Sequence, residues 1–255
     1  MVPTLDLIER IERSEIAYMS DRMAAITERA GNPEGVEVAR FGDAVAYYSA
    51  TMPWPAFNTV KGIRSLDGGL LDEIVTFYRE RNRKAQFEIV PGLADLRVMR
   101  LLAERGFYQS GFHASMVAVP QERAADSAVG DGISIREIGR DEFETYAAIH
   151  CRGTGLPDDG IPYVMANNLV LHGRPGWKFY LARCEGQPAA VGVMHIGKGV
   201  ASFTFAATLP EFRNKGLQRA LLGKRMEVAE EHGCSLVVSQ CAYLSPTIAI
   251  WSGLA

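Results

Sequence analysis

Residues 213–219 read Arg-Asn-Lys-Gly-Leu-Gln-Arg and combine three cations with one glycine. They follow an apolar run typical of a strand, residues 200–207, and they open an amphipathic segment typical of a helix, residues 217–232. The first N–H groups of a helix lack intrahelical partners, and the helix dipole is positive at that end. This arrangement predicts a binding site for a phosphate or pyrophosphate.

Two interpretations of these residues are open. If they bind an anion, Gly216 lets the backbone approach the ligand, because glycine has no side chain. The positive charges and the backbone N–H groups then come from Arg213, Asn214, Lys215, Leu217, Gln218 and Arg219. The alternative is a plain turn between a strand and a helix, in which the basic side chains are solvated.

The elements that must position this turn lie within residues 133–242. Alternating and apolar patterns predict strands at residues 133–138, 178–184, 188–197, 200–209 and 235–240. Helices are predicted at residues 141–150, in the stretch that ends near residue 172, and at residues 217–232. Gly233 is expected to end the last of them. The turn therefore lies between a strand and a helix, as an anion site at a helix start requires.

The first half of the chain repeats part of this order. Strands are predicted at residues 44–50, 85–90 and 111–119, and helices at residues 70–81 and 94–105. Residues 123–132 are small and polar without apolar periodicity, which is typical of a linker. We therefore expect two domains, residues 1–122 and 133–255, that derive from a duplicated unit.

The turn resembles a motif of a known family. Residues 213–218 are similar to the acyl-CoA pyrophosphate loop of the GNAT acetyltransferase superfamily, Arg/Gln-x-x-Gly-x-Gly/Ala. Thr208-x-Pro210-x-x-Arg213 fits the lead-in to that loop, whereas glycine or alanine is commoner at the position of Gln218. The resemblance covers most of residues 133–242. It implies an α/β fold of the α+β kind, with a mixed sheet that binds acetyl-CoA or another acyl-CoA as co-substrate.

The resemblance also implies where the rest of the coenzyme lies. In the family, the strand before the loop and the strand after the helix splay apart, and the pantetheine arm bonds to strand backbone between them. On this sequence, Ala206, Ala207 and Thr208 correspond to one side of the arm. Ser239 and Gln240 correspond to the other side.

The first half resembles the same fold in a degenerate form. Residues 101–107 look like the Leu-x-x-x-Gly-Phe helix ending of the family. The counterpart of the phosphate loop, residues 65–69, contains Asp67 and no adjacent cation, and a carboxylate repels pyrophosphate. We therefore expect a GNAT-like domain that does not bind acyl-CoA and instead shapes the acceptor pocket.

Acetylation of an amine needs a base for the amine proton and an acid for the leaving thiolate. His195, on a predicted strand, and Tyr243, after the last predicted strand, are the candidates, although a strand histidine can equally be a packed residue. His150 and Cys151 are adjacent, so their side chains diverge on a helix and do not form a nucleophilic pair. The four cysteines lack metal-ligand spacing, and we expect no metal.

The C-terminal residues depart from the family pattern, which expects a helix ending Arg-Asn-Tyr/Leu-Glu-Arg-Leu-Gly-Phe and two more strands. The chain instead reads Thr-Ile-Ala-Ile-Trp-Ser-Gly-Leu-Ala from residue 247. One back-translation of residues 248–255 encodes Arg-Asn-Leu-Glu-Arg-Leu-Gly in another reading frame. We therefore expect a frameshift near residues 245–247 and a truncated second domain. The strand at residues 235–240 then exposes an edge, which a partner chain in a homodimer could cover.

Composition excludes several classes of protein. The chain has 255 residues, of which 47% are hydrophobic and 22% charged, as in an ordinary globular protein. A net charge of −3 gives no basic excess for nucleic acid or an anionic membrane. Without a signal-peptide pattern or a long apolar run, and with cysteines that suit a reducing compartment, we expect a cytoplasmic protein.

The sequence thus predicts an N-acetyltransferase that moves an acetyl or other acyl group from acetyl-CoA to an amine of a small molecule or peptide. The alternative is a non-catalytic acyl-CoA-binding or interaction protein. A different nucleotide ligand is a third reading, against which the lack of Walker and Gly-x-Gly-x-x-Gly motifs argues.

Overall fold

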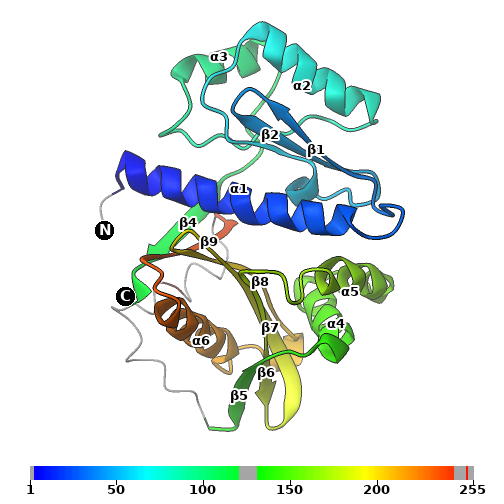
Figure 1. Cartoon of the computed structure of the whole chain (residues 1–255), viewed down its shortest axis with the longest axis vertical. Helices are drawn as coiled ribbons and strands as arrows, with labels where there is room; N and C mark the ends of the chain where they lie inside the picture. Colours follow the sequence, from blue (N-terminus) through cyan, green and yellow to red (C-terminus); the bar gives the residue numbers. More distant parts are fainter. Residues whose placement is uncertain (1–2, 121–130, 244–250, 252–255) are drawn as a thin grey trace. The chain divides into compact units, whose positions relative to one another are not determined.

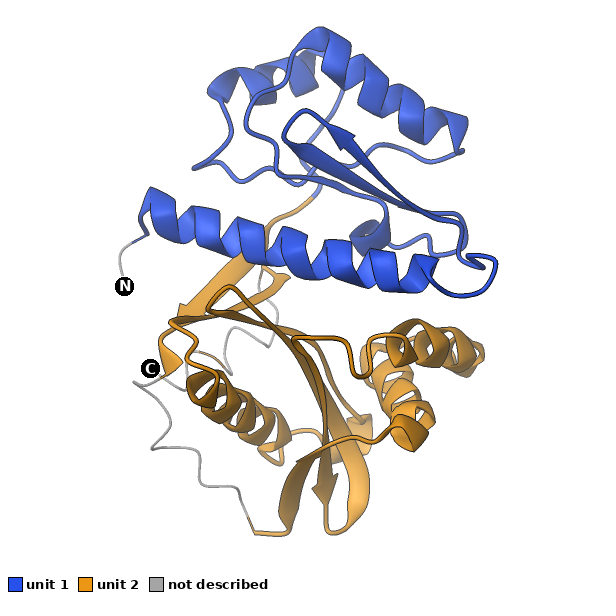
Figure 2. Ribbon diagram, in the orientation of Figure 1, with its two compact units in different colours: residues 1–110 blue, residues 111–255 orange. Residues whose placement is uncertain are grey.

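The computed structural model describes residues 3–120, 131–243 and 251 of the chain. The chain divides into two compact units, unit 1 (Met1–Ser110) and unit 2 (Gly111–Ala255) (Figures 1 and 2). Each unit is described by itself below.

Unit 1 begins with a long helix, α1 (Leu5–Thr27), and continues into a three-stranded antiparallel sheet. The sheet consists of β1 (Val36–Phe41), β2 (Ala44–Ser49) and β3 (Val60–Lys61), with the 3-10 turn η1 (Pro55–Phe57) before β3. Helices α2 (Gly68–Glu80) and α3 (Leu96–Glu104) follow. The sheet and these two helices share a core of Ala44, Ala46, Val60, Ile63, Leu71, Ile74, Tyr78, Val98 and Leu102.

Unit 2 is built on a six-stranded sheet in the order β4-β9-β8-β7-β6-β5. The strands are β4 (His113–Ala118), β5 (Ile133–Glu137), β6 (Trp177–Cys184), β7 (Gln187–Gly197), β8 (Val200–Thr208) and β9 (Leu236–Ala242). Neighbours pair antiparallel except β8 and β9, which pair parallel. The predicted mixed sheet is therefore present, and the parallel pair flanks the basic turn.

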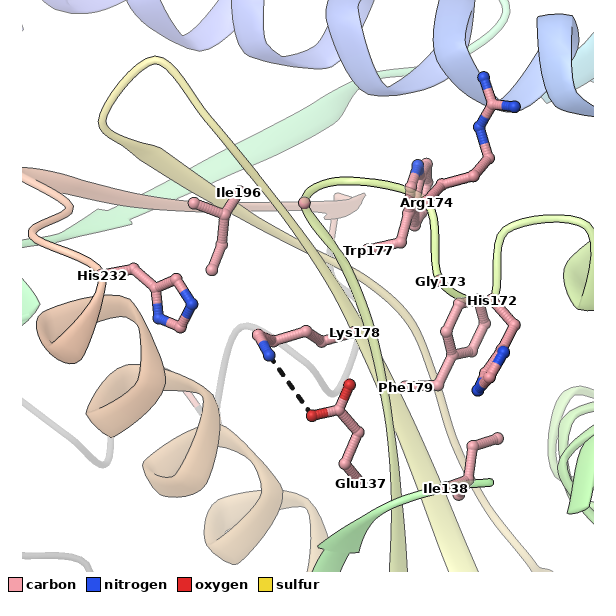
Figure 3. A pocket seen from close by; sticks show the side chains of 11 residues that line it. Glu137, Ile138, His172, Gly173, Arg174, Trp177, Lys178, Phe179, Ile196 and His232 are labelled. Atoms are coloured by element: carbon pink, nitrogen blue, oxygen red, sulfur yellow. Dashed lines mark hydrogen bonds and ion pairs between the residues drawn. The ribbon is translucent and has the colours of Figure 1, made fainter. Parts of the chain in front are cut away.

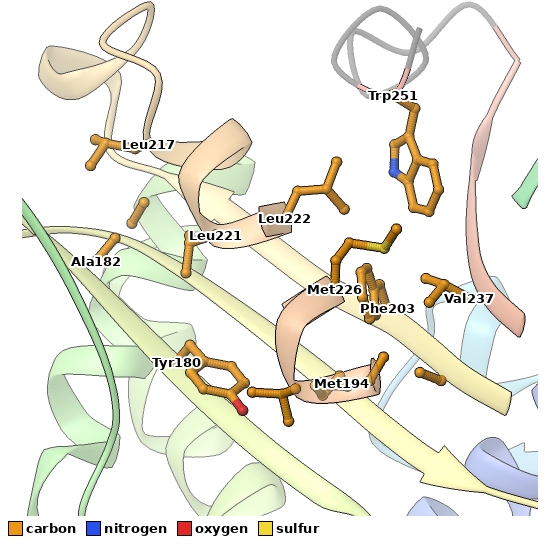
Figure 4. Packing of buried hydrophobic residues seen from close by; sticks show 14 of the residues in the cluster. Tyr180, Ala182, Met194, Phe203, Leu217, Leu221, Leu222, Met226, Val237 and Trp251 are labelled. Atoms are coloured by element: carbon orange, nitrogen blue, oxygen red, sulfur yellow. The ribbon is translucent and has the colours of Figure 1, made fainter. Parts of the chain in front are cut away.

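Helices cover both faces of this sheet (Figure 1). Helices α4 (Phe143–Thr154) and α5 (Ile161–Leu169) lie on one face, and α6 (Leu217–Glu231) lies on the other. Three 3-10 turns, η4 (Arg140–Glu142), η5 (Asp158–Gly160) and η6 (Pro210–Phe212), precede them. Leu221, Leu222 and Met226 of α6 pack on Met194 and Phe203 of the sheet (Figure 4). Gly233 follows α6 with φ 65°, as the predicted helix end requires.

The elements of unit 1 differ more from the sequence predictions. Residues 85–90 were expected to form a strand, but Phe87 makes only an isolated bridge to Val60. Helix α1 and strand β1 were not predicted. Polar residues of α1 such as Glu12, Glu15 and Arg22 are buried, which hides the apolar stripe that marks an amphipathic helix.

Strand β4 belongs to the sheet of unit 2. It hydrogen-bonds antiparallel to β9 from the pair His113–Ala242 to the pair Ala118–Val237. The compact units therefore divide at residues 110 and 111, whereas the linker was expected at residues 123–132. This pairing also corrects the expectation of an exposed edge at residues 235–240, because β9 lies between β8 and β4 of the same chain.

The predicted frameshift and truncation concern residues that lie almost wholly outside the described part of the chain. Of residues 244–255, only Trp251 is described. Its buried indole ring lies 6.2 Å from the ring of Phe203, on the α6 face of the sheet (Figure 4).

Helix α1 contributes buried carboxylates to unit 1. The Lys61 ammonium lies 2.7 Å from a carboxylate oxygen of Glu15 and 2.6 Å from one of Glu88. Glu12 accepts a hydrogen bond from the backbone N–H of Gly62. Burial raises the pKa of Glu15 to about 7, because one ammonium shared between carboxylates does not offset the loss of water.

This raised pKa makes unit 1 less stable as the pH rises. Between pH 4.5 and about 7 the folded state holds a proton on Glu15 that the unfolded chain releases. Glu15→Gln does not titrate, so the stability of the wild type relative to this variant is expected to fall by about 3 kcal/mol between pH 4.5 and pH 8. Amide exchange in α1 and β2 at both pH values measures the effect. The exposed Glu73→Gln is the control, and an equal stability difference at both pH values would contradict the prediction.

Candidate functional site: an uncapped helix start beside two parting strands

The basic turn ends at a helix start that has no side-chain cap. Helix α6 begins at Leu217, and its N-cap residue is Gly216, with φ 78°. Asn214 also has a positive φ, 61°, so the backbone curves twice within three residues. With no cap, the first N–H groups of α6 are left for water or for an anion.

Helix α2 of unit 1 provides an internal comparison. Its N-cap is Asp67, whose carboxylate accepts a hydrogen bond of 2.8 Å from the N–H of Leu70. The anion position at this helix start is therefore filled by the protein's own carboxylate. Of the two loops compared in the sequence, only the one before α6 leaves the helix start open.

The cations predicted to hold the anion are all on the surface. Arg213, Lys215 and Arg219 are exposed. Arg213 donates a hydrogen bond of 3.0 Å to the carbonyl of Gly153 at the end of α4, and the Lys215 ammonium lies 5.1 Å from the centre of the Phe212 ring. Three exposed positive residues therefore lie within the few positions around the open helix start.

Gln218, the position that departs from the family pattern, turns back toward β8. Its side-chain amide donates to the carbonyl of Ala207 at 3.0 Å and to the hydroxyl of Thr208 at 2.8 Å. The glutamine side chain, which is larger than the usual glycine or alanine, is thus hydrogen-bonded to the end of β8. Leu217 beside it is buried and packs α6 against the core. The glutamine ties the helix start to the strand that precedes the turn.

Strands β8 and β9 part next to this turn. Their pairing runs from Val200–Leu236 to Phe203–Ser239 and then ends, although β8 continues to Thr208. Beyond Ser239, β9 remains paired with β4 alone, as Gln240 is with Ser115. The backbone edge of Ala206 and Thr208 is therefore released from the parallel pair, and Ala206 is exposed.

A β-bulge lies in the parted segment of β8. Val193 pairs with Thr204 and Val191 with Ala207, so the single residue Gly192 lies opposite two residues. One of these two, Phe205, has φ 48°, which is unusual for a bulky residue. A bulge turns the backbone groups of one residue out of the regular ladder and bends the strand.

Helix α4 packs closely against the end of β8. A Cβ at Gly153 would lie 3.0 Å from both the Cβ of Ala207 and the carbonyl oxygen of Thr208. Only a glycine fits there without displacing the strand. The C-terminal end of α4 therefore helps to set the position of the residues that precede the basic turn.

This packing brings His150 of α4 to the bulge. Its ring lies 6.4 Å from the ring of Phe205 and stacks on Tyr146 at 6.0 Å. His150 is half-buried. The sequence prediction treated His150 only as a neighbour of Cys151 and did not place it near β8. The spacing of Phe143, Tyr146 and His150, which puts them on one face of the helix, would have indicated this position.

His195 lies elsewhere. It pairs with Ser202 on β8, and its ring lies 5.0 Å from the ring of Trp177. A Cβ at Gly176 would meet His195 Nε2 at 3.2 Å. Since Ser202 precedes Thr208 by about 20 Å of strand, the structure places His195 in a packed position away from the basic turn.

A cavity of about 410 Å³ opens at that same end of the sheet (Figure 3). Its lining includes Glu137, His172, Lys178 and His232, and Lys178 is paired with Glu137 at 3.4 Å. The cavity lies at the start of β6, whereas the basic turn follows the end of β8 at the opposite end of the sheet. Its lining side chains lie on both sides of the strands (Figure 3).

Tyr243 lies at the same end of the sheet as the basic turn, but on the side of β9 that faces β4. Its backbone N–H donates to the carbonyl of Phe112 at 3.0 Å, and its ring lies 6.5 Å from the Phe112 ring. The side chain is 63% exposed. The residue therefore extends the pairing of β9 with β4 and does not face β8.

Within residues 3–120 and 131–243, no group of His, Cys, Asp and Glu side chains is arranged to hold a metal ion. None of the helices in that part of the chain is long and apolar enough to cross a bilayer. Cys151, Cys184 and Cys234 are buried free thiols.

Comparison with known proteins places this geometry in a family context. A sequence profile of the Acetyltransferase (GNAT) family matches residues 139–246. No curated protein sequence matches the chain.

Two solved structures share the fold over most of the chain. A functionally unknown conserved protein from Staphylococcus epidermidis ATCC 12228 has a TM-score of 0.61 at 12% identity, covering 85% of this chain and 87% of that one. A GCN5-related N-acetyltransferase from Kribbella flavida has a TM-score of 0.59 at 17% identity, covering 86% and 85%. Together with the matched sequence profile and the mixed sheet, these findings show that residues 139–246 form a domain of the GNAT acetyltransferase family.

Proposed function

We propose that this protein transfers an acetyl or other acyl group from acetyl-CoA to the amine of a small molecule or peptide. The observation that carries the proposal is the open start of α6 beside the released edge of β8. One feature suits a pyrophosphate, and the other suits an extended arm that needs backbone partners.

The binding roles follow from the residues at these two places. The N–H groups of Leu217, Gln218 and Arg219 receive the pyrophosphate, with Arg213 and Lys215 supplying positive charge around it. The edge at Ala206, Ala207 and Thr208 holds the pantetheine arm. A thioester placed along this edge then reaches the bulge at Phe205.

The chemistry is attack of the amine nitrogen on the thioester carbonyl carbon, with formation of a C–N bond and loss of the C–S bond. His150 is the residue that we propose as the base, because its ring lies next to Phe205. The imidazole takes the amine proton and, as imidazolium, returns it to the departing thiolate, so that coenzyme A leaves as the free thiol. Backbone N–H groups at the bulge polarise the carbonyl oxygen.

The experiment uses the full chain with acetyl-CoA and a panel of small and peptide amines. Calorimetry with coenzyme A measures binding, and release of free thiol with each amine measures transfer. Binding together with amine-dependent thiol release supports the proposal. Binding without transfer to any amine overturns the transferase and leaves an acyl-CoA-binding protein. Absence of binding overturns both.

A further inference from the structure

Arg225 of α6 is a guanidinium buried in the core of unit 2. It is 4% exposed, and within the described residues no carboxylate forms an ion pair with it. Burial lowers its pKa to about 10, because the loss of water outweighs the opposing interaction with Tyr180. An isolated buried charge is costly, so a function is needed to explain its position.

The contacts of Arg225 converge on the bulge. Its Nη1 donates to the carbonyl of Val193 at 3.1 Å, and its Nε donates to the carbonyl of Leu221 at 3.1 Å. Its Cζ lies 4.7 Å from the centre of the Phe203 ring. A Cβ at Gly192, the residue opposite the bulge, would lie 3.1 Å from Cζ.

These contacts join three places that acyl transfer depends on. Val193 and Gly192 border the register shift on β7. Phe203 is the last residue of β8 that pairs with β9 before the strands part. Arg225 itself lies two turns after the helix start that faces the pyrophosphate. One side chain therefore links the anion-binding helix to the backbone that presents the thioester.

We propose that Arg225 is a positioning residue, which holds β7 and β8 in the bulged geometry that places the thioester. The expected effect of Arg225 on catalysis rests on the proposed function. Its structural part, that Arg225 fixes the bulge, can be tested whether or not the protein is a transferase.

The main test compares Arg225→Met with Lys224→Met. Methionine preserves much of the volume and removes the buried charge, a change that proteins often tolerate without loss of stability. Lys224 is the neighbouring residue on α6, and its ammonium lies 2.8 Å from a carboxylate oxygen of Glu227 on the same helix. We expect Arg225→Met to lower kcat by about 10- to 100-fold with KM for acetyl-CoA within about threefold of wild type, since misplacement affects the chemical step.

The second readout is amide exchange at residues 204–207, which we expect to be faster in Arg225→Met and unchanged in Lys224→Met. Gly192→Ala tests the same contact from the side of β7, because the added methyl group displaces the Arg225 guanidinium without removing it. It is expected to give the same two effects, and it decides the matter if Arg225→Met does not fold.

Several results overturn the inference. A folded Arg225→Met or Gly192→Ala protein with wild-type exchange at residues 204–207 overturns it, whatever its kcat. An equal loss of kcat in Lys224→Met also overturns it, because the effect is then not specific to the buried contact. If the wild-type protein transfers no acyl group, the proposed function fails, and the exchange measurement alone decides the role of Arg225.

Discussion

Gly216→Asp is expected to weaken coenzyme A binding by about 100-fold, or about 2.7 kcal/mol. The new carboxylate lies at the N-cap position of α6, which in α2 is occupied by Asp67. It repels the pyrophosphate at close range. The substitution thus places a negative charge at the start of α6, as Asp67 does at the start of α2. Calorimetry with coenzyme A measures the change.

Two variants control this experiment. Gly216→Asn has the same size as aspartate, tolerates a positive φ and carries no charge, so it is expected to weaken binding by less than about 10-fold. Asp67→Gly opens α2 and is expected to leave coenzyme A binding unchanged, because the loop before α2 has no cluster of cations. If Gly216→Asp binds as tightly as Gly216→Asn, the pyrophosphate does not lie at the start of α6. The difference between the two should also shrink at high salt.

His150→Gln is expected to lower kcat by about 100-fold while coenzyme A binding stays within about twofold of wild type, because a general base contributes to the chemical step. Glutamine keeps a polar side chain of similar length beside Tyr146 and Phe205 but cannot take up a proton. The pH–rate profile of the variant should lose the limb that reflects titration of the wild-type imidazole. Steady-state kinetics over a range of pH measures both effects.

His232→Gln is the matched control for this change. His232 is exposed at the end of α6, where its ring nitrogen lies 2.8 Å from the carbonyl of Val228. It is remote from the bulge, and we expect its substitution to change kcat by less than about twofold. A His150→Gln protein with the wild-type pH–rate profile would show that the amine proton leaves by another route.

The predictions from sequence were most accurate where structure depends on neighbouring residues. The apolar periodicity of α6, the alternation of β5 and β6 and the glycine after α6 all reflect interactions within a few positions. Unit 1 was less predictable for the same reason. Helix α1 buries Glu12 and Glu15 beside Lys61, a residue about fifty positions away, so its pattern does not read as amphipathic.

The candidate site divides in the same way. The cations of the basic turn and the glycine before α6 could be identified by type and spacing, and so could the contrast with Asp67. The residue that we propose as the base could not. His195 and Tyr243 were predicted from their place along the chain, and in the structure their rings lie beside Trp177 and Phe112. His150 reaches the bulge only because α4 packs on β8.

The sequence by itself determined that a helix begins without a cap among cations, since capping and charge depend on a few consecutive residues. Only the tertiary structure decided what lies around that helix start. The parting of β8 from β9, the bulge at Phe205 and the burial of Arg225 require strands and helices distant in sequence to meet. Pairing register and burial are set by contacts across the whole domain, and no local pattern encodes them.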